Sequence, residues 1–322
     1  MSEVSIQPRI RLAVTIDDLF LWKGVPWPPG CCPQTVVPAI TEALARHEMH
    51  GIYGFSATAP AEDEDSRQTI FEHWRDAGNR IGNHTHNLVS LNWVSDARFI
   101  KDIEASAALL APWIDENAPK YFRYPGDSCG DNKAKSEAVQ AYLADKGYKV
   151  VPVDLSFYDS EFLAAHVRFS RAGDDEGVAW LQQRFVETAL KQLQIQVALA
   201  RKMFNRDPVY IWRIHATALA GDCLYDILAA FKKAGVVFVS LAEAMIDPLH
   251  RRPAPILTPR FLNHLQTWAL HRELAIEEAP PSVLKEIEAR HIVEGLSSEA
   301  VLTAVAKSVA DEVGASFKPA PY

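Results

Sequence analysis

The sequence predicts an α/β protein: a distorted or incomplete (β/α) barrel of the TIM type, with about seven parallel strands and a C-terminal helical appendage. Strand-like and helix-like segments alternate seven times, which favours parallel strands with right-handed crossovers. Polar, reactive residue types follow five of the strands, as at the active face of such a barrel. The first strand lacks a G-x-G-x-x-G sequel, and no G-x-x-x-x-G-K-[ST] occurs, so nucleotide-binding folds are disfavoured.

The first half of the predicted barrel rests on β-branched runs, apolar helical spacing and Gly or Pro breaks. Its strands are 12–16, 51–55 and 80–84, and its helices are 35–49 and 66–76, with a long Pro- and Gly-rich loop over 19–34.

The second half continues the alternation. Ser95 is a candidate N-cap for a helix that ends near residue 116. The remaining predicted strands are 121–125, 148–154, 209–214 and 236–240, and the remaining helices are 131–146, 180–204 and 224–234.

The composition changes after Asp247-Pro248. Residues 249–262 are rich in Pro and Arg, and residues 263–313 have helical patterns without strands. We therefore expect a barrel over 1–248 and a linker with a helical extension over 249–322. The extension is predicted to pack on the barrel or on a neighbouring subunit, and the second option would make the protein a homo-oligomer.

The overall composition, with 48% hydrophobic and 23% charged residues among 322, is that of a soluble globular protein. The net charge of -8 argues against nucleic acid or an anionic membrane as partner. No apolar run approaches the roughly 20 residues of a membrane span, and the N-terminus shows no signal-peptide pattern, so we expect a cytoplasmic protein. The four cysteines show no framework spacing and are predicted to be free thiols.

Reactive side chains end five predicted strands, and parallel strands bring such ends to one face of the fold. They are Asp17 with Asp18, His84 with His86, Arg123, Asp154 and His215. Each alone has an ordinary explanation, as a turn residue, an ion-pair partner or a core histidine. Their convergence predicts a shared site. The set suits hydrolysis at a carbonyl, in which a metal held by carboxylate and imidazole activates water, a carboxylate takes its proton and a histidine protonates the leaving group.

The same strand ends resemble, in order and approximate spacing, the motifs of the polysaccharide deacetylase family, the NodB-homology and carbohydrate esterase family 4-like enzymes. The resemblance spans residues 11 to about 248. It is carried by T-I-D-D at 15–18, G-N-H-T at 82–85, F-R-Y-P-G at 122–126, Val153-Asp154 with Tyr158, and Ile214-His215.

The resemblance implies a role for each matching residue. Asp17 would be the general base, with Arg123 positioning it and Asp154 supporting that network. Asp18 and His84 would bind a divalent metal, usually zinc, and His215 would be the general acid. The implied reaction removes an N-acetyl or related acyl group from a glycan or small molecule.

Three positions depart from the family pattern. The second metal-binding histidine falls on Leu88, the second Asp of the fourth motif falls on Phe157, and Tyr158 stands where Trp is usual. If the strand continues past His84, His86 shares its face and could replace the missing ligand. Alternatively, His86 faces solvent or bonds to a loop.

Trp22, Trp27 and Tyr124 lie near the predicted mouth, where they could stack on a sugar or simply cover the barrel end. Asp127 is a further candidate substrate contact. We therefore expect a hydrolase of non-peptide amide bonds. The alternatives are a metal-poor or metal-free amidohydrolase acting on a small nitrogen-rich amide, and a non-catalytic carbohydrate-binding relative that lost its third ligand at Leu88. A pure binder needs neither the base Asp17 nor the acid His215, which favours an enzyme.

Overall fold

The strands all run parallel, as the sequence predicted. A computed structural model describes residues 9–22, 24–60, 64–276 and 281–317. Within these ranges the strands are β1 (Arg11–Asp17), β2 (Tyr53–Ser56), β3 (Arg80–Asn83), β4 (Tyr121–Phe122), β5 (Lys149–Val150), β6 (Val209–His215) and β7 (Val237–Phe238).

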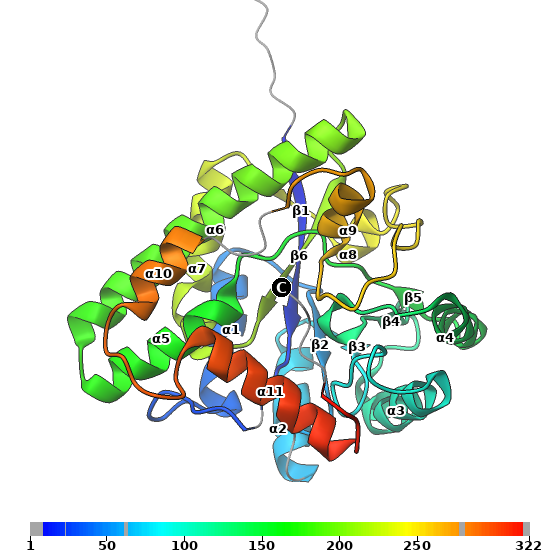
Figure 1. Cartoon of the computed structure of the whole chain (residues 1–322), viewed down its shortest axis with the longest axis horizontal. Coiled ribbons are helices and arrows are strands. Elements are labelled where there is room, and N and C mark those ends of the chain that lie inside the picture. Colours follow the sequence, from blue (N-terminus) through cyan, green and yellow to red (C-terminus); the bar gives the residue numbers. More distant parts are fainter. Residues whose placement is uncertain (1–8, 23, 61–63, 277–280, 318–322) are drawn as a thin grey trace, which may run out of the picture.

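The strand order is β5-β4-β3-β2-β1-β6, and β7 pairs with the start of β1. An isolated parallel bridge between Leu155 and Trp212 joins the chain after β5 to β6. The sheet therefore curls round on itself into a distorted barrel, which confirms the predicted fold class (Figure 1).

The helices between the strands surround the sheet, and each crosses over to the next parallel strand. They are α1 (Pro33–Arg46), α2 (Glu64–Asp76), α3 (Asp96–Leu110), α4 (Lys133–Asp145), α5 (Asp159–Ala172), α6 (Asp175–Phe204) and α7 (Ala218–Lys233). The predicted cap is confirmed, because the Ser95 side chain accepts a hydrogen bond from the backbone N–H of Arg98.

The predicted strand over 148–154 is much shorter in the structure, where β5 holds only two residues. The backbone N–H of Val151 still donates to Phe122 of β4, but those of Asp154 and Leu155 donate to Ile211 of β6. The backbone thus changes its hydrogen-bonding partner from β4 to β6 within four residues, and this change ends the regular strand.

Helix α5 has no counterpart in the sequence prediction, which leaves residues 155–179 unassigned. It follows Tyr158, whose φ of 62° is left-handed, and it ends at Gly173 with φ 66°. The next helix, α6, begins at residue 175 rather than 180 because the Asp174 side chain accepts a hydrogen bond from the N–H of Gly177.

Side chains on β1 alternate between two environments, as the period of two requires. Leu12, Val14 and Ile16 join the large core beneath the helices, whereas Ala13 belongs to the cluster inside the barrel. Asp17 shares the parity of Ala13, so its carboxylate points to the interior.

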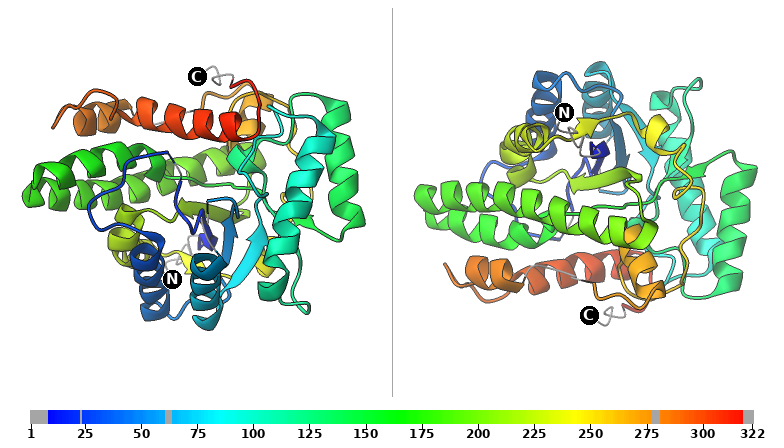
Figure 2. Two further views of the ribbon diagram at one scale, coloured as in Figure 1. Left: turned by 90° about the horizontal axis from the view of Figure 1, so that it is seen from below. Right: turned by 90° about the horizontal axis from the view of Figure 1, so that it is seen from above.

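The C-terminal part adds α8 (Leu241–Ala244), α9 (His264–His271), α10 (Pro281–Glu288) and α11 (Ser298–Glu312). Helices α10 and α11 pack on α5, and α9 packs on α6. Figure 2 shows α10 and α11 as an outer layer beside α5 and α6. No helix within the described ranges is long and apolar enough to span a membrane.

Candidate active site

Asp17 and His215 stand opposite each other on neighbouring strands, since the β1–β6 register pairs their Cα atoms. Both end their strands, and the same register pairs Thr15 with Arg213. Asp17, Arg213 and His215 line a cavity of about 300 Å³ at the carboxyl ends of the strands. Of the predicted site residues, those lining it are Asp17, Asp18, Trp22, His84, Asp127 and His215.

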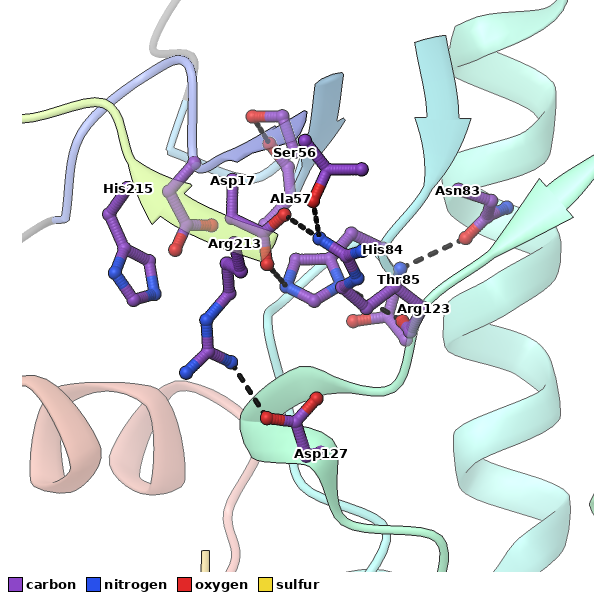
Figure 3. A network of polar contacts seen from close by, with 12 residues as sticks. Asp17, Ser56, Ala57, Asn83, His84, Thr85, Arg123, Asp127, Arg213 and His215 are labelled. Atoms are coloured by element: carbon purple, nitrogen blue, oxygen red, sulfur yellow. Dashed lines mark hydrogen bonds and ion pairs between the residues drawn. The ribbon is translucent and has the colours of Figure 1, made fainter. Parts of the chain in front are cut away.

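Arg123 holds one oxygen of Asp17 and leaves the other free. Its Nη1 donates to Asp17 Oδ1 at 2.5 Å and to Thr15 Oγ1 at 2.8 Å (Figure 3). The guanidinium is fully buried and its carbon lies 4.2 Å from the centre of the Phe55 ring. Asp17 Oδ2 is buried and has no hydrogen-bond partner among the described residues. It is therefore available to a water or substrate in the cavity.

His84 is oriented by the backbone of Arg123. Its Nδ1 lies 2.9 Å from the Arg123 carbonyl oxygen, which can only accept, so Nδ1 carries a proton. In the neutral ring, Nε2 is then an acceptor, and it lies 3.9 Å from Asp17 Oδ2. This is the tautomer that a metal-binding or substrate-binding imidazole requires.

Asp18 adopts a left-handed backbone, with φ 61°, that turns its side chain into the cavity. Its Oδ2 accepts a hydrogen bond from Trp22 Nε1 at 2.6 Å. Burial raises the pKa of Asp18, against the lowering effect of nearby His84 and His215.

The donors present do not complete a zinc site. Asp18 and His84 supply a carboxylate and an imidazole, but Leu88 lines the cavity in the place of the next expected ligand. Among the described residues there is no group of three His, Cys, Asp or Glu side chains that could hold a metal ion. Catalytic zinc takes three protein ligands, so the side chains here do not fit the predicted cofactor.

His86 lies outside the cavity lining. Its ring Nδ1 is 2.7 Å from Thr58 Oγ1, and its backbone carbonyl accepts hydrogen bonds from the N–H groups of Thr58 and Ala59. The structure thus places His86 in the loop-bonded arrangement, the second of the two alternatives left open by the sequence.

Asp159 is a site residue that sequence reasoning missed. Its Oδ2 lies 2.9 Å from His215 Nδ1 and accepts the backbone N–H of His215 at 2.7 Å. Burial opposes charging of the imidazole, but the carboxylate overcomes that effect and raises the pKa of His215. The pair therefore favours a protonated ring that can act as an acid.

The sequence does contain a signal for Asp159. The family motif places its second Asp at position 157, where Phe stands, but the acidic run at Asp159 and Glu161 is typical of the first turn of a helix. Recognising α5 from that turn and from Gly173 would have placed a carboxylate two residues later, beside the strand that ends at His215.

Asp127 and Arg213 form an ion pair on the cavity wall. Arg213 Nη1 donates to Asp127 Oδ2 at 2.9 Å, as drawn in Figure 3. Asp127, predicted as a substrate contact, thereby also holds the guanidinium that projects inward from β6.

Asp154 is directed away from the cavity. Its Oδ2 accepts hydrogen bonds from the N–H of Ile211 at 2.8 Å and from His250 Nε2 at 2.7 Å, and its Oδ1 lies 3.2 Å from His264 Nδ1. The structure therefore joins Asp154 to the C-terminal part rather than to Asp17 and Arg123.

Of the three aromatic residues that were predicted to contact the substrate, only Trp22 lines the cavity. Trp22 lines the cavity and meets the His215 ring at 4.9 Å between centroids. Trp27 lies behind it, with Nε1 donating to the Trp22 carbonyl. Tyr124 stacks on Phe99 and lines a second cavity of about 850 Å³.

The comparisons with known proteins bear on this arrangement. A family model described as polysaccharide deacetylase matches residues 7–151. No curated protein matches the chain. Similar solved structures include a CE4 esterase from Streptococcus mutans, with 19% identity over 72% of this chain and 86% of that one and a TM-score of 0.49. A CE4 family pseudoenzyme from Bacillus anthracis has 13% identity over 74% and 66%, with a TM-score of 0.49.

The matched segment contains Asp17, Asp18, His84 and Arg123, four of the residues assigned from the motifs. The match supports a deacetylase-like hydrolase. Residues 7–151 are therefore similar to the polysaccharide deacetylases, as the strand-end motifs in this segment predicted.

Proposed function

We propose that the protein hydrolyses an amide bond and removes an N-acyl group from a small soluble molecule or sugar. One observation carries the proposal: a free oxygen of Asp17 and the Asp159-bound ring of His215 face one cavity from opposite positions of β1 and β6. A base and an acid on facing strands are what amide hydrolysis needs, because water must lose a proton and the departing nitrogen must gain one.

The base step belongs to Asp17. Its Oδ2 accepts a proton from a water as the water oxygen bonds to the amide carbon. Arg123 fixes Oδ1 through a hydrogen-bonded ion pair of 2.5 Å, which leaves Oδ2 to act on the water.

The acid step belongs to His215. Its Nδ1 is bound to Asp159, so its Nε2 is the nitrogen that can deliver a proton to the amide nitrogen as the C–N bond breaks. The products are a carboxylic acid and an amine. When the products leave, Asp17 releases to solvent the proton that it took from water, and the imidazole of His215 regains one from solvent.

Zinc does not enter these steps, because Leu88 leaves the metal set incomplete. The proposed reaction rests on Asp17, Arg123, His215 and Asp159, and it corresponds to the metal-poor amidohydrolase among the alternatives. A non-catalytic binding relative is the second candidate, and Leu88 is the observation that favours it.

A single set of assays tests the proposal. Release of acetate and of free amine is measured for the purified protein with a panel of N-acetyl sugars and small amides, and bound metal is measured in the same sample. We expect release from at least one compound and a loss of at least about 10³-fold in Asp17→Asn, assayed at a temperature at which circular dichroism shows that the variant is folded. Binding of compounds without release of either product would instead establish the binding protein.

A further inference from the structure

We propose that helix α11 forms an apolar subsite of this cavity, so that the substrate is a small N-acyl compound with an apolar chain next to its amide. The inference rests on the proposed amide hydrolysis and specifies its substrate class. It assigns a role to the C-terminal part, which the family match over residues 7–151 does not cover.

The cavity has a polar wall and an apolar wall of different origin. The barrel strands contribute Asp17, Arg213 and His215, whereas the side chains that α11 contributes are almost all apolar. The C-terminal part supplies the polar residues Arg260, Asn263, Gln266 and Thr303 to the lining. It also supplies the apolar wall, which consists of Phe261, Leu262, Leu302, Val305, Ala306, Val309 and Phe317. A ligand that fills the cavity must therefore join a polar group to an apolar one.

Aromatic rings close one end of the apolar wall. Trp93 meets Phe261 and Phe317 edge-on, each at 6.0 Å between ring centroids. Phe261 lies directly over Gly126, where a Cβ atom would stand 2.6 Å from the Phe261 ring. The lack of a side chain at Gly126 allows this ring from the C-terminal part to approach the barrel.

Leu88, which stands where the family pattern has a metal-binding histidine, belongs to the same apolar wall. It lines the cavity and packs against the apolar cluster that contains Trp22, Leu163 and Val301, as do Leu302 and Val305 of α11. At this position the chain has an isobutyl group instead of an imidazole, so the apolar surface extends from α11 toward the catalytic groups.

Buried polar contacts fix α11 in place. Arg168 of α5 is 2% exposed, and its guanidinium donates to the backbone carbonyls of Ile287, Arg290 and Leu296 just before α11. Ser298, the first residue of α11, donates to the carbonyl of Glu161 at 2.5 Å, and Glu161 itself lines the cavity. The apolar wall is therefore a built part of the site.

The volume of the cavity also favours a small substrate. A volume of about 300 Å³ lies at the lower end of the range for small-molecule sites. It suits a single acylated unit with a short apolar chain. The chain could belong to the acyl group or to the amine, and the arms of the test separate these two sources.

The test measures amine or acid release from two series of compounds by the full-length protein. One series is glucosamine N-acylated with acetyl, butanoyl, hexanoyl or octanoyl groups, and the other is N-acetylated butylamine, hexylamine or octylamine. A chitin hexamer is the polymer comparison. We expect kcat/KM to rise about fourfold per added methylene in one series until the pocket is full, and the hexamer to be the poorest substrate.

The variant Val305→Asp places a charge on the apolar wall. We expect it to lower kcat/KM for the best long-chain compound at least about tenfold more than it lowers kcat/KM for the N-acetyl compound. Ala304→Asp is the matched control, because Ala304 is exposed on the same helix and does not line the cavity. Val305→Ser repeats the measurement with less disturbance if the Asp variant melts early.

Calorimetry distinguishes the apolar subsite from amide hydrolysis. It measures the binding of N-octanoylglucosamine and of N-acetylglucosamine to the wild type and to both Val305 variants. Tighter octanoyl binding that Val305→Asp removes supports the subsite even if no compound is cleaved, in which case amide hydrolysis fails alone. Hydrolysis that is indifferent to chain length and to Val305→Asp would overturn the subsite and leave the proposed function standing.

Discussion

Asp159 binds His215 twice through one oxygen, which receives both the backbone N–H and the ring Nδ1. The backbone contact fixes the carboxylate relative to β6, and the ring contact then fixes the imidazole relative to the carboxylate. His215 Nε2 is thus aimed into the cavity with little rotational freedom, as preorganised acid catalysis requires.

Replacing Asp159 by Asn should weaken the acid. The carboxylate raises the pKa of His215, so in wild type the protonated, active ring persists to higher pH. In Asp159→Asn that pKa falls, and the basic limb of the pH profile of kcat should move to lower pH, with a loss of roughly 10²-fold at neutral pH. Asp175→Asn, at an exposed position in the first turn of α6, is the control. An unmoved basic limb would exclude His215 as the acid.

Arg123 should be indispensable for stability as well as for orientation. Arg123→Met leaves the buried Asp17 carboxylate without its partner, which costs about 3–5 kcal/mol of unfolding free energy in comparable pairs. Urea denaturation measures the loss. Asp17→Asn in the same chain removes the uncompensated charge and should restore part of the stability, and a double variant no more stable than Arg123→Met would contradict the pairing.

Asp154 and His250 should make stability depend on pH. Both His250 ring nitrogens face acceptors, the Ala244 carbonyl and Asp154, so the ring is held as the cation. Burial opposes this charge, but Asp154 overcomes it and raises the pKa of His250. The contribution is therefore complete below the ordinary histidine pKa of about 6.5 and is lost as the pH rises through the raised value.

The measurement for this pair is the urea midpoint between pH 6 and pH 9 for wild type and for His250→Gln. The wild type should lose stability over that interval, and the variant should start lower and lose less. His271→Gln, at an exposed histidine, should follow the wild-type curve.

Leu88→His should create a metal site. Leu88 has a left-handed backbone with φ 58°, which histidine adopts more readily than most residues. An imidazole there would join Asp18 and His84 as a third ligand. Metal analysis after dialysis should then find about one zinc per chain in the variant and much less in wild type. Equal zinc in both proteins would show that Leu88 is not the reason for the incomplete set.

The strand ends could be predicted because they depend on local patterns. The period of two places Asp17 on the face of β1 that points into the barrel, and parallel pairing brings the ends of β1, β3 and β6 together. In the structure Asp17, His84 and His215 line one cavity. Their individual roles stay predictions.

The partners of Asp154 could not be predicted from local sequence patterns. Its strand was expected to run on to residue 154, but the chain crosses from β4 to β6 after Val151, and its partners are His250 and His264 from beyond the predicted boundary at 248. No pattern in residues 148–154 encodes a partner some hundred residues away. The same holds for α11, whose apolar face is visible in the sequence but whose position over the cavity depends on Arg168.

Arg168 also has a consequence for the order in which the protein assembles. Every barrel strand precedes residue 287, so a chain emerging during synthesis can complete the sheet before the carbonyls that accept from Arg168 exist. Until then α5 carries a guanidinium in an apolar setting without its acceptors, and α5 begins at Asp159. The segment from residue 287 to residue 296 is thus needed before α5, which begins with the Asp159 that is paired with His215, has its full set of contacts.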